Sequence, residues 1–95
     1  MPLGTVTVKF FATLREITGT KSVEIDAADI KHLLEELTRM FGKRFSDAVI
    51  EPQSGGLKRF YSCMVNGKRI ELLNGYQTKL NDGDAVALFP PVGGG

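Results

Sequence analysis

One stretch of the sequence, residues 29–42, restricts the architecture more than any other. Its apolar residues recur at the spacing of one face of an α-helix: Ile30, Leu33, Leu34, Leu37, Met40 and Phe41. Asp29 stands at the position of an N-cap acceptor, and Gly42 stands where helices commonly end. Because each fully buried apolar side chain contributes roughly 1.5–3 kcal/mol, this face must pack on another layer. On the polar side, we expect Glu35 and Arg39 to form an i,i+4 ion pair.

Alternation of apolar and polar residues indicates the strands of that second layer. The predicted strands cover residues 5–10, 22–26, 61–65, 69–72 and 84–89. The first two are expected to form a hairpin, and the Asn66-Gly67 pair is a strong turn signal between the third and the fourth. The order of elements predicts an α+β roll, in which a mixed sheet of about four to five strands packs on one main helix.

The segment between this helix and the third strand gives a weaker signal. Phe45, Ala48 and Val49 are spaced for a single helical turn. Residues 52–56, Pro-Gln-Ser-Gly-Gly, combine turn-forming residues and are typical of a mobile loop. We therefore expect disorder near Gly55.

Composition limits the classes of function that remain. With 95 residues and 42% hydrophobic content, we expect one domain over residues 1–89 followed by a flexible tail at 90–95. The net charge of +1 offers no basic excess for nucleic-acid binding. No apolar run approaches the roughly 20 residues of a membrane span, so no membrane contact is predicted. A signal peptide is not recognisable either, and the expected location is the cytoplasm.

The reactive side chains do not suggest an enzyme. One cysteine and one histidine are too few for a structural zinc site, and no nucleophile, base and orienter occur together. Cys63 lies at an inward position, where a thiol is more often an inert core residue than a sulfur relay. His32, near the helix start, is expected to be half-exposed and without a role. We predict no catalytic residue, no metal and no bound cofactor.

The last seven residues, Phe-Pro-Pro-Val-Gly-Gly-Gly at 89–95, give the clearest functional signal. Pro90 and Pro91 have a fixed φ and no backbone donor, so the final strand must end there. Without Cβ atoms, the glycines that follow can enter a passage too narrow for side chains. We expect the Gly95 carboxylate to be presented to the active site of another protein. The tail that would carry it consists of Val92, Gly93, Gly94 and Gly95.

Two distant segments carry a family resemblance. The ending at 89–95, and residues 10–16 followed by Thr18-Gly19, are similar to those of the MoaD group of ubiquitin-like sulfur carriers. The long segment at 45–60 resembles the archaeal small ubiquitin-like modifiers. Gly93 departs from the family, which more often has Ala or Ser there, and we expect a looser tail. The resemblance implies a β-grasp fold, with the first and last strands parallel at the centre of the sheet and the third beside the last.

The resemblance also implies a function for the terminus. An E1-like enzyme would use ATP to adenylate Gly95, and a sulfur donor would then displace AMP to leave a thiocarboxylate. As a sulfur carrier, the chain would serve the large subunit of molybdopterin synthase; as a modifier, Gly95 would be joined to lysines of target proteins. The thiamin-pathway carriers are a more distant possibility. The alternative is a β-grasp interaction module whose terminus is never activated.

Alternation along the central strands predicts a second site. Seven residues are expected to face the helix: Val6, Val8, Phe10, Cys63, Val65, Val86 and Leu88. The opposite face would then hold Phe11, Met64, Ala85, Ala87 and Phe89. Because no predicted element covers that face, we expect it to dock a partner together with the tail. The docking residues proposed are Phe11, Met64, Ala87 and Phe89.

Overall fold

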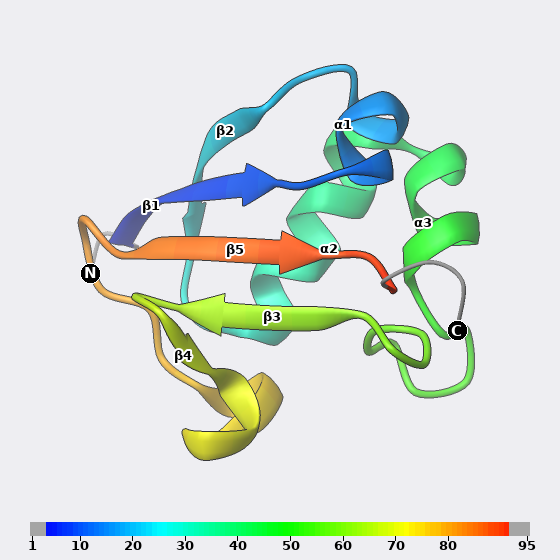
Figure 1. The fold of residues 1–95 in the computed structure, drawn as a ribbon. Helices are drawn as coiled ribbons and strands as arrows, with labels where there is room; N and C mark the ends of the chain where they lie inside the picture. The colour runs from blue at the N-terminus through cyan, green and yellow to red at the C-terminus, as the bar shows by residue number, and fades with distance from the viewer. Residues whose placement is uncertain (1–3, 92–95) are drawn as a thin grey trace.

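The computed structural model describes residues 4–91, which form a sheet with helices on one side (Figure 1). The strands are β1 Gly4–Phe10, β2 Ser22–Ala27, β3 Ser62–Val65, β4 Lys68–Arg69 and β5 Ala85–Phe89. The α-helices are α1 Thr13–Thr18, α2 Ile30–Phe41 and α3 Lys43–Val49, and the short 3-10 helices are η1 Ile70–Leu72 and η2 Gly75–Gln77. This is the α+β arrangement that the sequence predicted.

The five strands are ordered β2-β1-β5-β3-β4. β1 runs parallel to β5 and antiparallel to β2, whereas β3 is antiparallel to both β5 and β4. The expected central pair of first and last strands, with the third beside the last, is therefore confirmed. Because β1 and β5 are parallel, both end at the same edge of the sheet, beside α1 and α3 (Figure 1).

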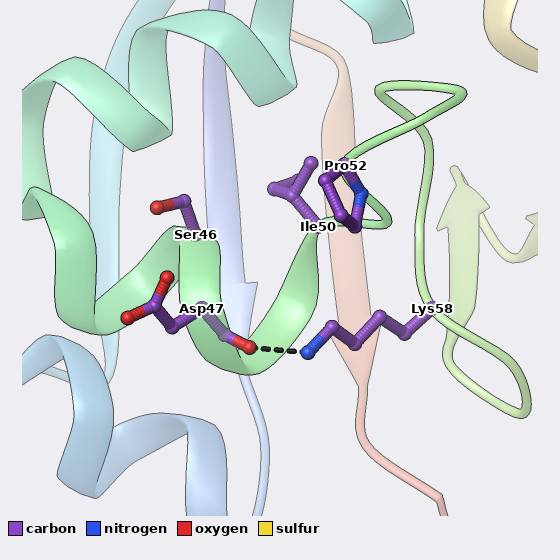
Figure 2. Close-up of a pocket in the computed structure, with 5 residues that line it drawn as sticks. All are labelled: Ser46, Asp47, Ile50, Pro52 and Lys58. Carbon is purple, nitrogen blue, oxygen red and sulfur yellow. Dashed lines mark hydrogen bonds between the residues drawn. The ribbon is translucent and has the colours of Figure 1, made fainter.

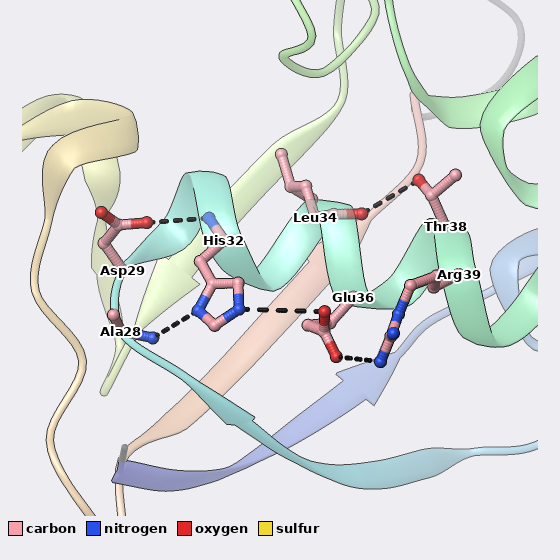
Figure 3. A network of polar contacts seen from close by, with 7 residues as sticks. All are labelled: Ala28, Asp29, His32, Leu34, Glu36, Thr38 and Arg39. Carbon is pink, nitrogen blue, oxygen red and sulfur yellow. Dashed lines mark hydrogen bonds and ion pairs between the residues drawn. The ribbon is translucent and has the colours of Figure 1, made fainter. Parts of the chain in front are cut away.

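The main helix packs as its apolar spacing predicted, with Leu33, Leu34 and Leu37 buried. It begins where the Asp29 carboxylate accepts the His32 N–H at 2.8 Å (Figure 3). It ends at Gly42, whose φ is 76°. Satisfying an otherwise unpaired N–H of the first turn is what makes Asp a good cap.

Two expectations about this helix are wrong. Met40 is 52% exposed, because it lies at the edge of the apolar stripe in the last turn. Arg39 does not pair with Glu35; it contacts Glu36, one turn away at i,i+3, with 2.9 Å between Nη2 and Oε1 (Figure 3). Residues three apart also adjoin on a helix surface, so spacing alone could not decide between the two glutamates.

Two short elements differ from prediction. The turn expected after β1 contains α1, a single short helix that buries Leu14 and ends at Gly19 with φ 75°. The fourth strand is limited to Lys68–Arg69, because the chain turns into η1 and buries Ile70 while leaving Leu72 77% exposed. Neither element is long enough to show a clear periodicity in sequence.

The expected disorder near Gly55 is also wrong. α3 is longer than the single turn predicted, and the loop after it closes on itself through Gly55 N–H to the Glu51 carbonyl at 2.8 Å. The loop is attached to η2 by Leu57 N–H to the Tyr76 hydroxyl at 2.9 Å. A Cβ at Gly56 would lie 2.8 Å from the Tyr76 ring, so glycine lets the backbone pack there.

Candidate functional site

The alternation predicted for the central strands is observed. All seven residues expected to face the helix are buried: Val6, Val8, Phe10, Cys63, Val65, Val86 and Leu88. On the opposite side, which we call the outer face, Met64, Ala87 and Phe89 are half-buried and Ala85 is exposed. Helices α1, α2 and α3 do not cover the outer face, since α2 lies behind the sheet and the other two lie at its edge (Figure 1).

Four residues form a contiguous apolar surface on this face, which we call the outer patch: Phe11, Met64, Ala87 and Phe89. Phe11 stacks on Phe89, with ring centroids 4.4 Å apart and planes 15° apart. Met64 lies opposite Ala87 in the register of β3 and β5. The aromatic pair hides part of its own surface, which is why Phe11 and Phe89 are half-buried.

A hollow of about 300 Å³ adjoins the outer patch and was not anticipated from sequence. We call it the basic hollow; it is lined by Lys9, Phe10, Phe11, Arg15, Lys21 and Ser22. Arg15 donates from Nε to the Phe10 carbonyl at 3.0 Å, and its guanidinium carbon lies 5.8 Å from the centroid of the Phe11 ring. The alternation of β1 sends Lys9 outward, but only the tertiary structure places it near Arg15 and Lys21.

The last described residues of the chain lie next to these two features. β5 ends at Phe89, Pro90 is half-buried and Pro91 is exposed. The predicted reactive terminus, Gly95, and the tail residues before it, Val92, Gly93 and Gly94, lie outside the described residues. Of the tail predicted at residues 90–95, the structure therefore describes only Pro90 and Pro91.

An exposed aromatic residue precedes β3 at the same edge. Phe60 is 74% exposed and has φ 69°, a left-handed conformation that bulky residues rarely adopt. The guanidinium of Arg59 lies over its ring, 5.1 Å from the centroid. Because Ser62 pairs with Phe89, Phe60 comes just before the part of β3 that lies beside the end of β5.

A second hollow, of about 240 Å³, lies between α3 and the loop after it (Figure 2). Ile50 and Pro52 give it an apolar side, and Ser46, Asp47 and Lys58 give it a polar one. The Lys58 ammonium donates to the Asp47 backbone carbonyl, so it closes the loop onto α3 (Figure 2). No nucleophile and general base converge there, and the arrangement is that of a braced loop.

The remaining reactive side chains have structural surroundings. Cys63 is 1% exposed, and burial, with a smaller contribution from the Glu71 carboxylate, raises the pKa of its thiol to about 12. The thiolate that nucleophilic chemistry needs is thereby suppressed. His32 is half-exposed; its Nδ1 accepts the Ala28 N–H at 3.0 Å, and its Nε2 lies 3.8 Å from Glu36 (Figure 3). The ring thus adds to the capping network of α2.

Between residues 4 and 91, no cluster of histidine, cysteine and acidic side chains is placed to hold a metal ion. No helix within the same range has the length and apolar character needed to cross a membrane.

The chain matches the ThiS family over residues 8–95. It is 37% identical over 95 residues to small archaeal modifier protein 3 of Haloferax volcanii, covering 93% of this chain and 96% of that protein. It is 31% identical over 94 residues to the molybdopterin synthase sulfur carrier subunit of Escherichia coli, covering 95% of this chain and 99% of that protein. The structure of small archaeal modifier protein 1 from Methanosarcina acetivorans has a TM-score of 0.83 at 29% identity, covering 98% of both chains.

These comparisons agree with the fold. The order of strands around a central parallel pair, with α2 across the sheet, is the ubiquitin-like β-grasp expected from sequence. The two curated relatives are a protein modifier and a sulfur carrier by name. With a match over residues 8–95 and relatives at 37% and 31% identity along nearly the whole chain, this protein belongs to the ThiS family.

Proposed function

We propose that this chain is a ubiquitin-like carrier whose terminal carboxylate, on Gly95, is activated by an E1-like adenylating enzyme. The carboxylate is anionic and has no good leaving group, so it cannot acylate a nucleophile directly. Its oxygen would attack the α-phosphate of ATP and expel pyrophosphate, leaving a Gly95 acyl-adenylate. The ATP belongs to the activating enzyme, and this chain contributes the substrate rather than the catalyst.

Two products follow from the same adenylate. The terminal sulfur of a donor persulfide attacks the acyl carbon and expels AMP; a second thiol of the donor then attacks the resulting acyl disulfide, which releases the Gly95 thiocarboxylate and leaves a disulfide on the donor. A lysine amine of a target protein releases AMP and forms an isopeptide bond. The first use resembles the sulfur carrier of molybdopterin synthase, which would hand sulfur on through the large subunit. The second resembles the archaeal modifiers. The family relatives support both.

The observation that carries this proposal is the position of the chain exit. β5 occupies the centre of the sheet and ends at Phe89, so the last described residues, Pro90 and Pro91, directly follow a member of the outer patch. A partner that binds the outer patch would therefore lie next to the end of the described chain. The folded domain would supply the surface that the partner recognises, and the glycines would let the tail enter a narrow active site.

The direct test is ATP–pyrophosphate exchange by the cognate adenylating enzyme in the presence of this chain. We expect exchange with the full chain and none after deletion of Gly94 and Gly95, with unchanged thermal unfolding of the truncated protein. An interaction module without terminal activation would give no exchange with either chain and the same affinity for its partner. Mass spectrometry then distinguishes the products. Replacement of an oxygen by sulfur in this chain indicates a sulfur carrier, and target lysines bearing Gly-Gly after digestion indicate a modifier.

The outer patch is tested by Phe11→Ala and Met64→Ala. We expect both variants to remain folded and to bind the adenylating enzyme about tenfold or more weakly, because aromatic and large apolar residues dominate interface energies. Leu72→Ala is the matched control, since Leu72 is an exposed apolar residue of η1 outside the outer patch. Equal affinity of Phe11→Ala and wild type would remove the outer patch from the proposal.

A further inference from the structure

The basic hollow lies at the edge of the outer face where β5 ends, since its lining residue Phe11 stacks on Phe89. Resting on the function proposed above, we propose that this hollow binds a carboxylate-bearing segment of the adenylating enzyme and so fixes the direction in which the tail enters it. Lys9, Arg15 and Lys21 provide the cationic groups. Phe11 is a wall of the hollow and also a member of the outer patch, so the two surfaces are continuous.

Three different segments hold the cations around the hollow. Lys9 is an exposed outward residue of β1, and Lys21 is an exposed residue directly before β2 whose carbonyl accepts the Phe10 N–H at 2.9 Å. Arg15 comes from α1 and is oriented by its Nε hydrogen bond to the Phe10 carbonyl. None of the ion pairs found between residues 4 and 91 involves these cations, so a carboxylate would not have to displace an internal partner.

The acidic groups of the outer face lie towards its other end. In the β1–β2 register, Glu24 pairs with Thr7 and Asp26 with Thr5, both nearer the start of β1 than Lys9 is. Asp82 joins them by accepting the Thr5 N–H at 3.0 Å. The face is therefore positive near the chain exit and negative at the opposite end. Such a dipolar face steers an incoming partner and favours one docking orientation over its reverse.

Other charges near the outer patch weaken this polarity only locally. Arg69, opposite Met64 in the β3–β4 register, is paired with Glu71 at 3.6 Å. Glu16 follows Arg15 in α1 and is exposed. The cations of the basic hollow thus remain the concentrated positive group beside the chain exit.

An acidic protein segment suits the basic hollow better than a nucleic acid does. The net charge is only +1, and the acidic end of the same face would repel a phosphate backbone. An apolar patch bordered by charged residues is also the usual anatomy of a protein–protein interface. The partner expected is therefore an adenylating enzyme with Asp or Glu side chains beside the entrance for the tail.

The test uses the doubly reversed variant Lys9→Glu/Lys21→Glu in ATP–pyrophosphate exchange with the cognate adenylating enzyme. At low salt we expect the KM for the carrier to rise about tenfold or more, as steering by a focused charge implies. The kcat should stay unchanged, because the tail and its chemistry are intact, and the difference between variant and wild type should shrink as salt is raised. The matched control, Lys31→Glu/Lys79→Glu, makes the same change in net charge at exposed lysines outside the basic hollow.

Each other outcome has a defined meaning. Equal KM values for wild type and Lys9→Glu/Lys21→Glu, or equal increases in that variant and the control, overturn the inference while the proposed function stands. If reversal impairs folding, Lys9→Gln/Lys21→Gln must give a smaller rise in KM in the same direction, and an unchanged KM overturns it. Binding of a labelled RNA oligonucleotide that depends on Lys9 and Lys21, with KM unaffected, would also overturn it. Absence of exchange with the wild-type chain overturns the proposed function itself and this inference with it.

Discussion

The two faces of the central strands differ in how deeply they bury aromatic side chains. On the inner face, Phe10 is fully buried and meets the edge of the Phe41 ring, with centroids 5.6 Å apart. On the outer face, the next residue, Phe11, is half-buried and stacks on Phe89. A shift of one residue along the chain thus moves a phenyl ring from the core to the outer patch, the surface that we propose for docking. Alternation along the chain therefore separates the side chains that stabilise the core from those that lie on the outer face.

The largest expected effect comes from truncating the two neighbouring phenylalanines. Phe10→Ala should lower the free energy of unfolding by about 3–5 kcal/mol, because it leaves a cavity in the core. Phe11→Ala should lower it by less, because the half-buried ring leaves no core cavity and its stacking on Phe89 contributes only about 0.5–1.5 kcal/mol. Urea unfolding of the two variants measures the difference. Equal losses would show that the outer patch is part of the core, and the contrast between the faces would fail.

A smaller expected effect is the loss of folding stability at high pH that comes from Cys63, which faces inward. The pKa of its thiol is about 12 in the fold, against an ordinary value of 9.0. Above pH 9 the unfolded chain loses this proton while the folded chain keeps it. Stability should therefore fall as pH rises towards 12, with a limiting slope of about 1.4 kcal/mol per pH unit.

The measurement is the free energy of unfolding in urea between pH 8 and pH 10.5, for wild type and for Cys63→Ala. Burial also raises the pKa of Tyr61, but this residue is present in both proteins and cancels in their difference. The additional loss of unfolding free energy that wild type shows with rising pH, relative to Cys63→Ala, measures the contribution of the thiol. Parallel curves for the two proteins would mean that Cys63 is not held in an apolar environment.

Sequence reasoning succeeded where a period was sustained. The residues of α2 repeat over several turns between Asp29 and Gly42, and β1 and β5 alternate for their whole lengths. A one-residue slip in those strands would turn the buried set to solvent, so the pattern leaves a single register. That register is what placed Met64 and Ala87 side by side on the outer face.

Sequence reasoning failed where a few tertiary contacts outweigh local preference. The glycines near Gly55 indicate mobility, yet Tyr76, distant in sequence, accepts the Leu57 N–H and packs against Gly56. The basic hollow was missed for a similar reason, since Lys9, Arg15 and Lys21 come from three segments (β1, α1 and the connection before β2) and share no spacing. Side chains brought together only by the fold leave no periodic signal.

The smallest expected effect concerns Phe60, an aromatic residue outside both faces. Its left-handed φ of 69° costs a residue with a Cβ roughly 1–2 kcal/mol, whereas glycine adopts it freely. Because Phe60 is 74% exposed, little packing is lost on truncation. Phe60→Gly should therefore be more stable than Phe60→Ala by about 1 kcal/mol. The greater flexibility of the glycine variant's unfolded chain offsets only part of this gain.

Thermal and urea unfolding of wild type, Phe60→Gly and Phe60→Ala test this order. If Phe60→Ala is as stable as Phe60→Gly, the backbone at this position is not left-handed in solution. If the order holds, an exposed phenylalanine is kept in a strained conformation beside the end of β5, where it adds nothing to the core. Strain of this kind clusters at active sites, ligand clamps and switch regions, so the same variants then belong in the exchange assay with the adenylating enzyme. A rise in KM for both would extend the proposed docking surface from the outer patch to the start of β3.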